Sequence, residues 1–393
     1  MVRKPAPATV AIHPRPERGA GPLVTPIYMS STFRLRDARQ GAEFTHATAP
    51  PEFYTRWGNP TTADLEDTVA RLEGGAKALA TGSGMGAIAP ALLTFARPGG
   101  RIVAGAGLYA ATTEMLERFL PRFGLRTAWV DPRTPGAFAG AVDSDTDIVY
   151  VETPANPTMA ITDLREAAKA ARSVGALLMV DNTFATPVNQ RPIEFGADIV
   201  LHSATKYLGG HGDVVAGVAV MRTRGLFEKV WATYKLLGPT IGPFEAFLVR
   251  RGIKTLPARV RVQNRSAGAL AEHLDAHPAV AKVYYPGLPS FEQHRLARRQ
   301  MDGFGGMLSF ELKAGYRAGL RFVEGVRLAT LAVSLGGTET LVEHPGSMTH
   351  GTLSAKERRA QGIGEGLVRV SVGLEDVDDL IEDFDRALRA ARR

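Results

Sequence analysis

Lys206 is the residue whose sequence setting most suggests chemistry. It lies in IVLHSATKYLGGHGD, where an apolar strand ends, a Ser-x-Thr-Lys step follows and glycines come directly after. A lysine at such an edge would be partly desolvated, and its lowered pKa would make it a nucleophile toward an aldehyde. Ser203 and Thr205 add hydroxyls that can bind a phosphate. The alternative at this point is an ordinary surface lysine in a loop.

Asp181 ends the strand pattern ALLMVDNT, 25 residues before Lys206, and is predicted on the neighbouring strand. A carboxylate that faces a pyridine nitrogen keeps it protonated, so that the ring can take up the electrons of a carbanion. Taken alone, Asp181 could equally cap the next helix. A lysine for an aldehyde, hydroxyls for a phosphate and a carboxylate for a pyridine nitrogen together indicate pyridoxal 5′-phosphate (PLP).

Three further features fit a cofactor of this kind. GSGMGAI (82–88), with Gly84 and Met85, follows a strand and opens a helix whose N-terminus can bind phosphate, although such a turn also serves tight packing. Tyr109 could stack on a ring, or be a core or surface aromatic. Arg369, between apolar neighbours in VRVSVGLE, could bind an amino acid's α-carboxylate or form an internal salt bridge.

The elements that must position these residues form an α/β pattern. Apolar strands alternate with helical stretches such as 84–96, 109–124 and 164–175, which predicts a mostly parallel sheet covered on both faces, with ligands beyond the carboxyl ends of the strands. The predicted strands are KALATG (77–82), RIVAG (101–105), RTAWV (126–130), DIVYVET (147–153), ALLMVDNT (176–183), DIVLHS (198–203) and VVAGVAVM (214–221).

The strand signal fades after Met221. Helices are predicted over 243–256 and 258–277, as one long connection interrupted near Pro257, followed by a smaller α+β unit with strands at 304–312 and 366–375 and a final helix at 376–393. We expect a Pro-rich N-terminal arm (1–60) that contacts a partner subunit, a large PLP-binding domain (61–255) and a C-terminal domain (256–393).

Composition narrows the classes of function. The chain has no cysteine and no HExxH spacing among its nine histidines, so no disulfide, thiolate chemistry or metal site is expected. The net charge of +7 is spread among acids and comes mostly from arginine, so nucleic acid is not an expected partner. No apolar run reaches the ~18 residues of a membrane span, and the N-terminus lacks a signal peptide's apolar core, so cytoplasm is the default.

Taken together, the motifs resemble the Cys/Met-metabolism (trans-sulfuration) family of PLP enzymes, of fold type I. The family includes methionine γ-lyase, cystathionine γ-synthase, cystathionine β- and γ-lyases and O-acylhomoserine sulfhydrylases. The resemblance runs from TPIYMSSTF (25–33) to the end of the chain. Its motifs are YTRWGNPT, GSGMGAI, ETPANPTM, DNTFATP, SATKYLGGHGD, RGIKTLP, VSLGGTETLVEHPGSMTH and VRVSVGLE.

The resemblance implies a role for each matching residue. Lys206 would carry PLP as a Schiff base and act as general base, Asp181 would face the pyridine nitrogen, and Tyr109 would stack on the ring and assist proton transfer. Tyr54 and Arg56 would reach the cofactor phosphate of a neighbouring subunit in a homotetramer of two dimers. The phosphate cup would consist of the Gly84 and Met85 backbone with Ser203 and Thr205, and the groups near the substrate carboxylate and the cofactor's phenolic oxygen would be Asn156, Ser334 and Arg369.

At two positions this chain differs from the residues typical of family members, and both positions concern which substrate it uses. Family members that handle cystathionine typically carry Glu immediately before the serine that matches Ser334, and this chain has Val333. Methionine γ-lyases usually carry cysteine two residues after the active-site tyrosine, and this chain has Ala111. The expected activity is γ-elimination on methionine-like substrates, giving an α-keto acid, ammonia and a thiol.

Several alternatives stay open. Within the family, one alternative is γ-replacement on O-acetyl- or O-succinylhomoserine, as in a sulfhydrylase or cystathionine γ-synthase. The other is cleavage of cystathionine, as in a cystathionine γ-lyase. An aminotransferase would share the fold, but GLYAAT around Tyr109 and SATKYLGGHGD disfavour it. A non-enzymatic PLP-binding regulator is also disfavoured, because no helix-turn-helix segment is predicted beside the domain pair.

Overall fold

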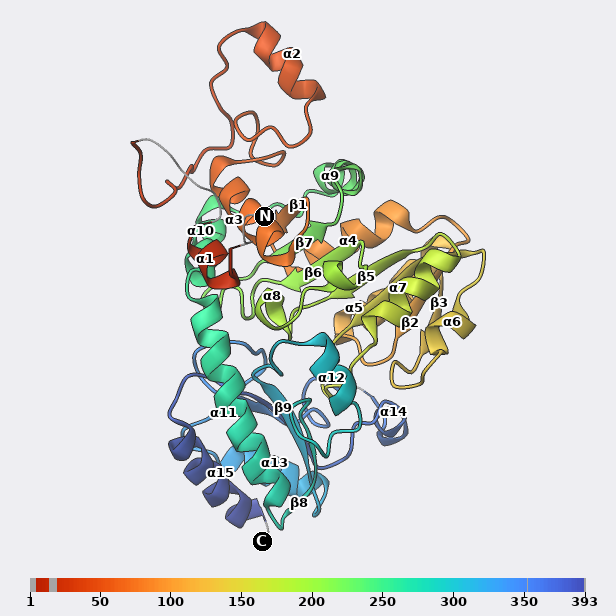
Figure 1. The fold of residues 1–393 in the computed structure, drawn as a ribbon, viewed down its shortest axis with the longest axis vertical. Helices are drawn as coiled ribbons and strands as arrows, with labels where there is room; N and C mark the ends of the chain where they lie inside the picture. The colour runs from red at the N-terminus through yellow and green to blue at the C-terminus, as the bar shows by residue number, and fades with distance from the viewer. Residues whose placement is uncertain (1–4, 14–19, 352, 392–393) are drawn as a thin grey trace.

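The computed structural model describes residues 5–13, 20–351 and 353–391, and these build two β-sheets covered by helices (Figure 1). Residues 1–4 and 14–19 of the predicted arm, and 392–393 at the end of the predicted C-terminal domain, lie outside the described residues. The chain passes from one sheet to the other through the long helix α11 (Leu256–Ala276), which runs along one side of the molecule.

The larger sheet has seven strands in the order β1-β7-β6-β5-β4-β2-β3. β7 runs antiparallel to both of its neighbours, β1 and β6, and the other four strand pairs are parallel, so the prediction of a mostly parallel sheet is confirmed. The strands are β1 (Lys77–Thr81), β2 (Arg101–Gly105), β3 (Arg126–Val130), β4 (Thr146–Glu152), β5 (Leu177–Asp181), β6 (Ile199–Ser203) and β7 (Gly217–Met221).

Helices cover both faces of this sheet, and β5 shows why. Leu178 and Val180 pack into one apolar cluster with Leu164, whereas Met179 packs into a second cluster with Leu92. Successive side chains of a strand point to opposite faces, so a strand that is apolar throughout needs cover on both. α3 (Pro60–Glu73) precedes β1, and α9 (Arg224–Leu237) follows β7. The helices between the strands are α4 (Gly84–Phe95), α5 (Ala110–Glu114), α6 (Ala137–Ala141), α7 (Leu164–Ser173) and α8 (Thr186–Asn189).

The segment 109–124 differs from the single helix predicted for it. It divides into α5, a π-helical turn (Met115–Phe119) and a 3₁₀ turn (Leu120–Phe123). Pro121 lacks the N–H that an α-helix needs and its ring crowds the carbonyl four residues earlier, so a regular helix cannot continue through it. Tyr109 lies at the start of this divided helical segment, directly before α5.

The smaller sheet has five strands in the order β10-β11-β12-β9-β8. The predicted strands β9 (Met307–Leu312) and β12 (Leu367–Ser371) and the final helix α15 (Val377–Ala391) are confirmed. The predicted interruption lies between α10 (Pro243–Ile253) and α11, just before Pro257. Elements not predicted here are β8 (Val280–Tyr284), β10 (Thr330–Leu331), β11 (Leu341–Glu343), α12 (His294–Gln300), α13 (Tyr316–Gly325) and α14 (Ala355–Ala360).

The described part of the N-terminal segment carries α1 (Pro7–Ile12) and α2 (Ala38–His46), and α2 projects from the body at the top of Figure 1. Apolar side chains in this segment are exposed to solvent: Leu23 is 93% and Met29 is 73% exposed. A single β-bridge joins Thr32 to Tyr54. Across the described ranges, no helix is both long and apolar enough to cross a membrane.

Candidate functional site

Lys206 lies just beyond the carboxyl end of β6, at the edge of the sheet where the sequence placed it. Its Nζ donates a hydrogen bond to Ser334 Oγ at 2.8 Å, so it meets the loop between β10 and β11 of the smaller sheet. Burial lowers the pKa of Lys206 to about 8, and the nearby Arg369 guanidinium adds to this effect while Glu343 opposes it. An amine with this pKa is available as a nucleophile and as a base near neutral pH.

This lowered pKa predicts how Lys206 reacts in the cofactor-free chain. The uncharged fraction of an amine of pKa about 8 rises from about a tenth at pH 7 to about nine-tenths at pH 9. We therefore expect the rate of reductive methylation at Lys206, followed by mass spectrometry, to rise about ninefold between these pH values and then level off. The matched control is the denatured chain, where the rate should keep rising toward a pKa of ~10.4. Identical profiles for both states would contradict the account.

Asp181 ends β5, on the strand beside β6, and is 6% exposed. Its Oδ1 accepts a hydrogen bond from the Thr183 N–H at 3.0 Å. Burial raises its pKa, and the Thr183 hydrogen bonds and the His202 ring only partly oppose this rise. A buried carboxylate of this kind gains from a cationic partner, and a protonated pyridine nitrogen would provide one.

The N-terminus of α4 lies against the end of β6. A Cβ on Gly84 would come within 3.0 Å of Ser203 Cβ and 3.2 Å of Ser203 Oγ, so only glycine lets these two backbones approach this closely. The dipole and N–H groups of the 12-residue α4 therefore lie beside the Ser203 hydroxyl, where an anion would be stabilised. The site residues fit the phosphate of PLP at this end, Asp181 fits its ring nitrogen, and Lys206 fits its aldehyde.

Thr205, predicted as a phosphate-binding residue, connects two loops in the structure. Its hydroxyl donates to the Ala216 carbonyl at 3.1 Å and accepts from the Ala216 N–H at 3.0 Å. These two bonds tie the loop after β6 to the loop before β7. Met85, the other predicted cup residue, is half-buried on the first turn of α4, and its Sδ lies 3.8 Å from the Thr112 hydroxyl.

Arg369 extends from β12 toward the larger sheet and joins three partners. One guanidinium nitrogen, Nη1, lies 3.1 Å from Asn156 Oδ1 and 3.1 Å from Glu343 Oε1. The other, Nη2, donates to the Ser334 carbonyl at 2.9 Å. The internal salt bridge considered as the alternative role is therefore present, while its bonds to Asn156 and Ser334 place Arg369 beside Lys206.

Ser334 is the residue that connects the two sides of the site. Its backbone has a φ of 82°, in the left-handed region that non-glycine residues rarely adopt. The contacts to Lys206 and Arg369 hold it there, and strain of this kind concentrates at functional sites. Val333 precedes it directly and is 56% exposed, so an apolar side chain lies in the open beside these contacts.

Tyr109 is 50% exposed at the N-terminus of α5, and its N–H donates to Glu152 Oε2 at 2.8 Å. Tyr54 and Arg56 lie elsewhere: the Arg56 guanidinium is 5.3 Å from the Tyr54 ring centroid and donates to the Lys235 carbonyl of α9. These contacts do not bring Arg56 to Lys206 of its own chain. The role of both residues at a neighbouring subunit's phosphate stays a prediction.

Sequence reasoning missed three polar residues of this region. Glu152 binds the Tyr109 backbone, Glu343 pairs with Arg369, and Thr183 Oγ1 accepts from the Ser203 N–H at 2.8 Å. Glu152 opens ETPANPTM, Thr183 lies in DNTFATP and Glu343 precedes His344 in VEHPGS, so each stood in a motif already singled out. For Glu152, a polar residue at the end of an apolar strand was the available signal.

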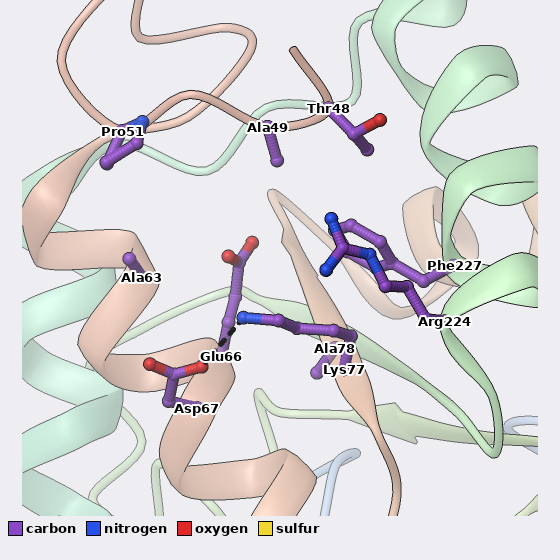
Figure 2. Close-up of a pocket in the computed structure, with 10 residues that line it drawn as sticks. All are labelled: Thr48, Ala49, Pro51, Ala63, Glu66, Asp67, Lys77, Ala78, Arg224 and Phe227. Carbon is purple, nitrogen blue, oxygen red and sulfur yellow. Dashed lines mark hydrogen bonds and ion pairs between the residues drawn. The ribbon is translucent and has the colours of Figure 1, made fainter.

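A separate cavity of about 320 Å³ lies between the 48–51 loop, α3, the start of β1 and α9. Figure 2 shows Glu66, Lys77 and Arg224 lining it, and Lys77 Nζ is 3.4 Å from Asp67 Oδ1. None of the predicted site residues lines this cavity. Among the described residues, no group of three or more His, Asp or Glu side chains could hold a metal ion.

Comparison with known proteins gives consistent matches. Residues 8–389 match the family model of the Cys/Met metabolism PLP-dependent enzymes. The chain is 46% identical to an L-methionine gamma-lyase of Porphyromonas gingivalis over 97% of this chain and 96% of the relative. It is 39% identical to an O-succinylhomoserine sulfhydrylase of Pseudomonas aeruginosa over 93% and 90%.

Solved structures agree. The fold superposes on a cystathionine gamma synthase of Xanthomonas oryzae pv. oryzae, in complex with aminoacrylate and cysteine, with a TM-score of 0.92 and 41% identity over 99% of both chains.

Proposed function

The chain belongs to the Cys/Met metabolism family of PLP-dependent enzymes, and from this premise we propose that it catalyses γ-elimination on methionine. Methionine and water would give an α-keto acid, ammonia and methanethiol. The observation that carries the choice is Val333, an exposed apolar side chain directly before Ser334, which contacts both Lys206 and Arg369. A thioether tail without charge suits such a neighbour better than the ammonium group of cystathionine does.

PLP, when bound, supplies an electron sink for the carbanion that forms at the substrate's Cα. Asp181 would hold a proton at the pyridine nitrogen. The phosphate would be held by the hydroxyls of Ser203 and Thr205 and by the N-terminus of α4 at Gly84 and Met85. The uncharged Lys206 amine would take the Cα proton, since its pKa of about 8 leaves a substantial uncharged fraction near neutrality.

Substrate orientation would depend on Arg369. Its guanidinium, already held by Asn156 and Ser334, would bind the α-carboxylate and keep Cα within reach of Lys206. The half-exposed Tyr109 would give a proton to the leaving sulfur.

A homotetramer of two dimers is the proposed assembly, with Tyr54 and Arg56 serving the phosphate of a neighbouring subunit and the cytoplasm as the proposed compartment. The projecting α2 and the open side chains of Leu23 and Met29 support a segment that packs on another chain. The arm (1–60) and the domain limits at 61–255 and 256–393 are proposed with it.

The activity is tested by supplying the purified protein with methionine, homocysteine, cystathionine, O-acetylhomoserine and O-succinylhomoserine, with and without sulfide. We expect keto acid, ammonia and methanethiol in equal amounts from methionine. A second candidate, γ-replacement on an O-acylhomoserine, is favoured by Ala111 and by the P. aeruginosa sulfhydrylase relative. Sulfide-dependent formation of a new amino acid, without keto acid from methionine, would support that candidate and overturn the first.

Val333 gives a specificity prediction. The ammonium group of cystathionine's distal arm would be partly desolvated beside valine without a partner, at a cost of about 1–3 kcal/mol or roughly ten- to a hundred-fold in kcat/KM. Val333→Glu should therefore move the ratio of kcat/KM for cystathionine over methionine upward by about this factor. Both substrates are measured on both proteins, and Val333→Gln, which adds bulk and polarity without charge, is the matched control. An unmoved ratio, or a wild-type preference for cystathionine, would remove Val333 as the discriminator.

A further inference from the structure

Glu152 is a buried carboxylate that the proposed chemistry does not use. It is the last residue of β4, is 6% exposed, and pairs in register with Asp181, the last residue of β5. Because the two strands are parallel neighbours, the two side chains project from the same face of the sheet. The larger sheet therefore ends in two adjacent carboxylates, of which the mechanism requires only one.

The contact that Glu152 makes points to its role. Glu152 Oε2 accepts the N–H of Tyr109 at 2.8 Å, across 43 residues of sequence. Tyr109 is the N-cap residue of α5, its side chain makes no capping hydrogen bond, and the residue is 50% exposed. The first N–H groups of a helix have no partner inside the helix, so the bond from Glu152 fixes the position of the Tyr109 backbone from which the ring extends.

The charged and titratable neighbours of Glu152 decide its protonation. Burial and the adjacent Asp181 raise the pKa of Glu152 well above its usual range, and the N–H groups of Tyr109 and Asn156 and the Arg369 guanidinium oppose this only in part. Tyr150 lies two residues earlier on the same strand face, and it is fully buried and adds no cation. Two adjacent buried carboxylates hold a shared proton more easily than two charges, and the Thr183 hydrogen bonds favour ionised Asp181.

We propose that Glu152 is a positioning residue that acts as an uncharged acceptor, fixing the Tyr109 backbone and leaving the negative charge of the pair on Asp181. Tyr109 would thereby keep its ring over the cofactor, and Asp181 would stay free to hold the proton at the pyridine nitrogen. This inference rests on the proposed roles of Tyr109 and Asp181, but it does not depend on which amino acid is the substrate.

Three variants distinguish the role of Glu152 as a hydrogen-bond acceptor from the role of its negative charge. Glu152→Gln keeps an acceptor oxygen at the same reach and cannot ionise, whereas Glu152→Ala removes both properties. Glu152→Asp keeps a carboxylate but is one methylene too short to reach the Tyr109 N–H. The Asp variant also serves where the Ala variant fails to fold.

Two measurements follow on each full-length variant. The first is hydrogen exchange of the peptides that cover Tyr109 in the cofactor-free protein, and the second is PLP affinity together with kcat and KM on whichever substrate the wild type turns over. We expect Glu152→Gln to keep the Tyr109 protection and a kcat within about threefold of wild type. The Ala and Asp variants should lose that protection and lower kcat by about ten- to a hundred-fold, since a ring displaced by about 1 Å can cost that much.

Other patterns would overturn the proposal. A Gln variant as impaired as the Ala variant would mean that the charge of Glu152 is required. Ala and Asp variants indistinguishable from wild type would mean that Glu152 does not position Tyr109. Because hydrogen exchange needs no turnover, the pattern at Tyr109 can hold even where methionine proves to be the wrong substrate, so the two proposals fail separately.

Discussion

Replacing Lys206 with alanine is expected to lower kcat by at least about 10³-fold, the largest single effect in the account. Lys206 is proposed both to hold the cofactor and to take the Cα proton, and a positioned general base alone contributes about 10²- to 10⁴-fold. Its surroundings support both roles, because burial lowers its pKa to about 8 and Ser334 orients its Nζ at 2.8 Å. The measurement is kcat and KM on methionine with saturating PLP.

The matched control is Lys229→Ala, which removes an exposed lysine of α9 and should leave kcat unchanged. Lys206→Arg adds a second test, because it keeps a positive charge but cannot supply an uncharged amine. We expect it to be as inactive as the alanine variant. Activity within tenfold of wild type in either Lys206 variant would show that another group acts as the base.

Mixing two inactive proteins is expected to restore activity, which is the second large effect. Arg56 contacts Lys235 rather than the site of its own chain, and the proposal assigns it to a neighbouring subunit's phosphate. In a mixed dimer of Lys206→Ala and Arg56→Ala chains, one site would contain both substitutions and the other site would contain neither. Random exchange should therefore restore about a quarter of the wild-type activity, because half of the dimers are mixed and each has one intact site of two.

The control for this experiment mixes Lys206→Ala with Asp181→Asn. Both residues belong to the same chain's site, so every site in a mixed dimer keeps one lesion and no recovery is expected. Subunit exchange is verified independently, for example by native mass spectrometry. If exchange occurs and Lys206→Ala with Arg56→Ala stays inactive, each site is built from a single chain.

The larger sheet was predictable because most of its strands are buried on both faces. A run such as Leu177–Asp181 is apolar throughout and ends in one charged residue, which marks both the strand and its functional end. Lys206 follows from the same reasoning at the end of β6. The smaller sheet was harder, since β10 has two residues and β11 has three, and segments this short carry no readable alternation.

Side-chain contacts between distant segments mark the limit of prediction. Arg369 could be read as a carboxylate ligand or as half of a salt bridge, and the structure shows the Glu343 pair together with bonds to Asn156 and Ser334. The bond between Glu152 and the Tyr109 backbone spans 43 residues, and no spacing in the sequence encodes it. Tyr54 and Arg56 were identified only through the family resemblance, because their proposed contacts cross between chains.

The most direct test of the account is to locate the cofactor on the chain. Borohydride reduces the C=N bond that joins PLP to its lysine, which fixes the label for peptide mapping by mass spectrometry. The chain has ten lysines, and we expect a single label on Lys206, in the peptide that carries SATKYLGGHGD. A label on any of the other nine, or no label on a protein that still turns over methionine, would contradict it.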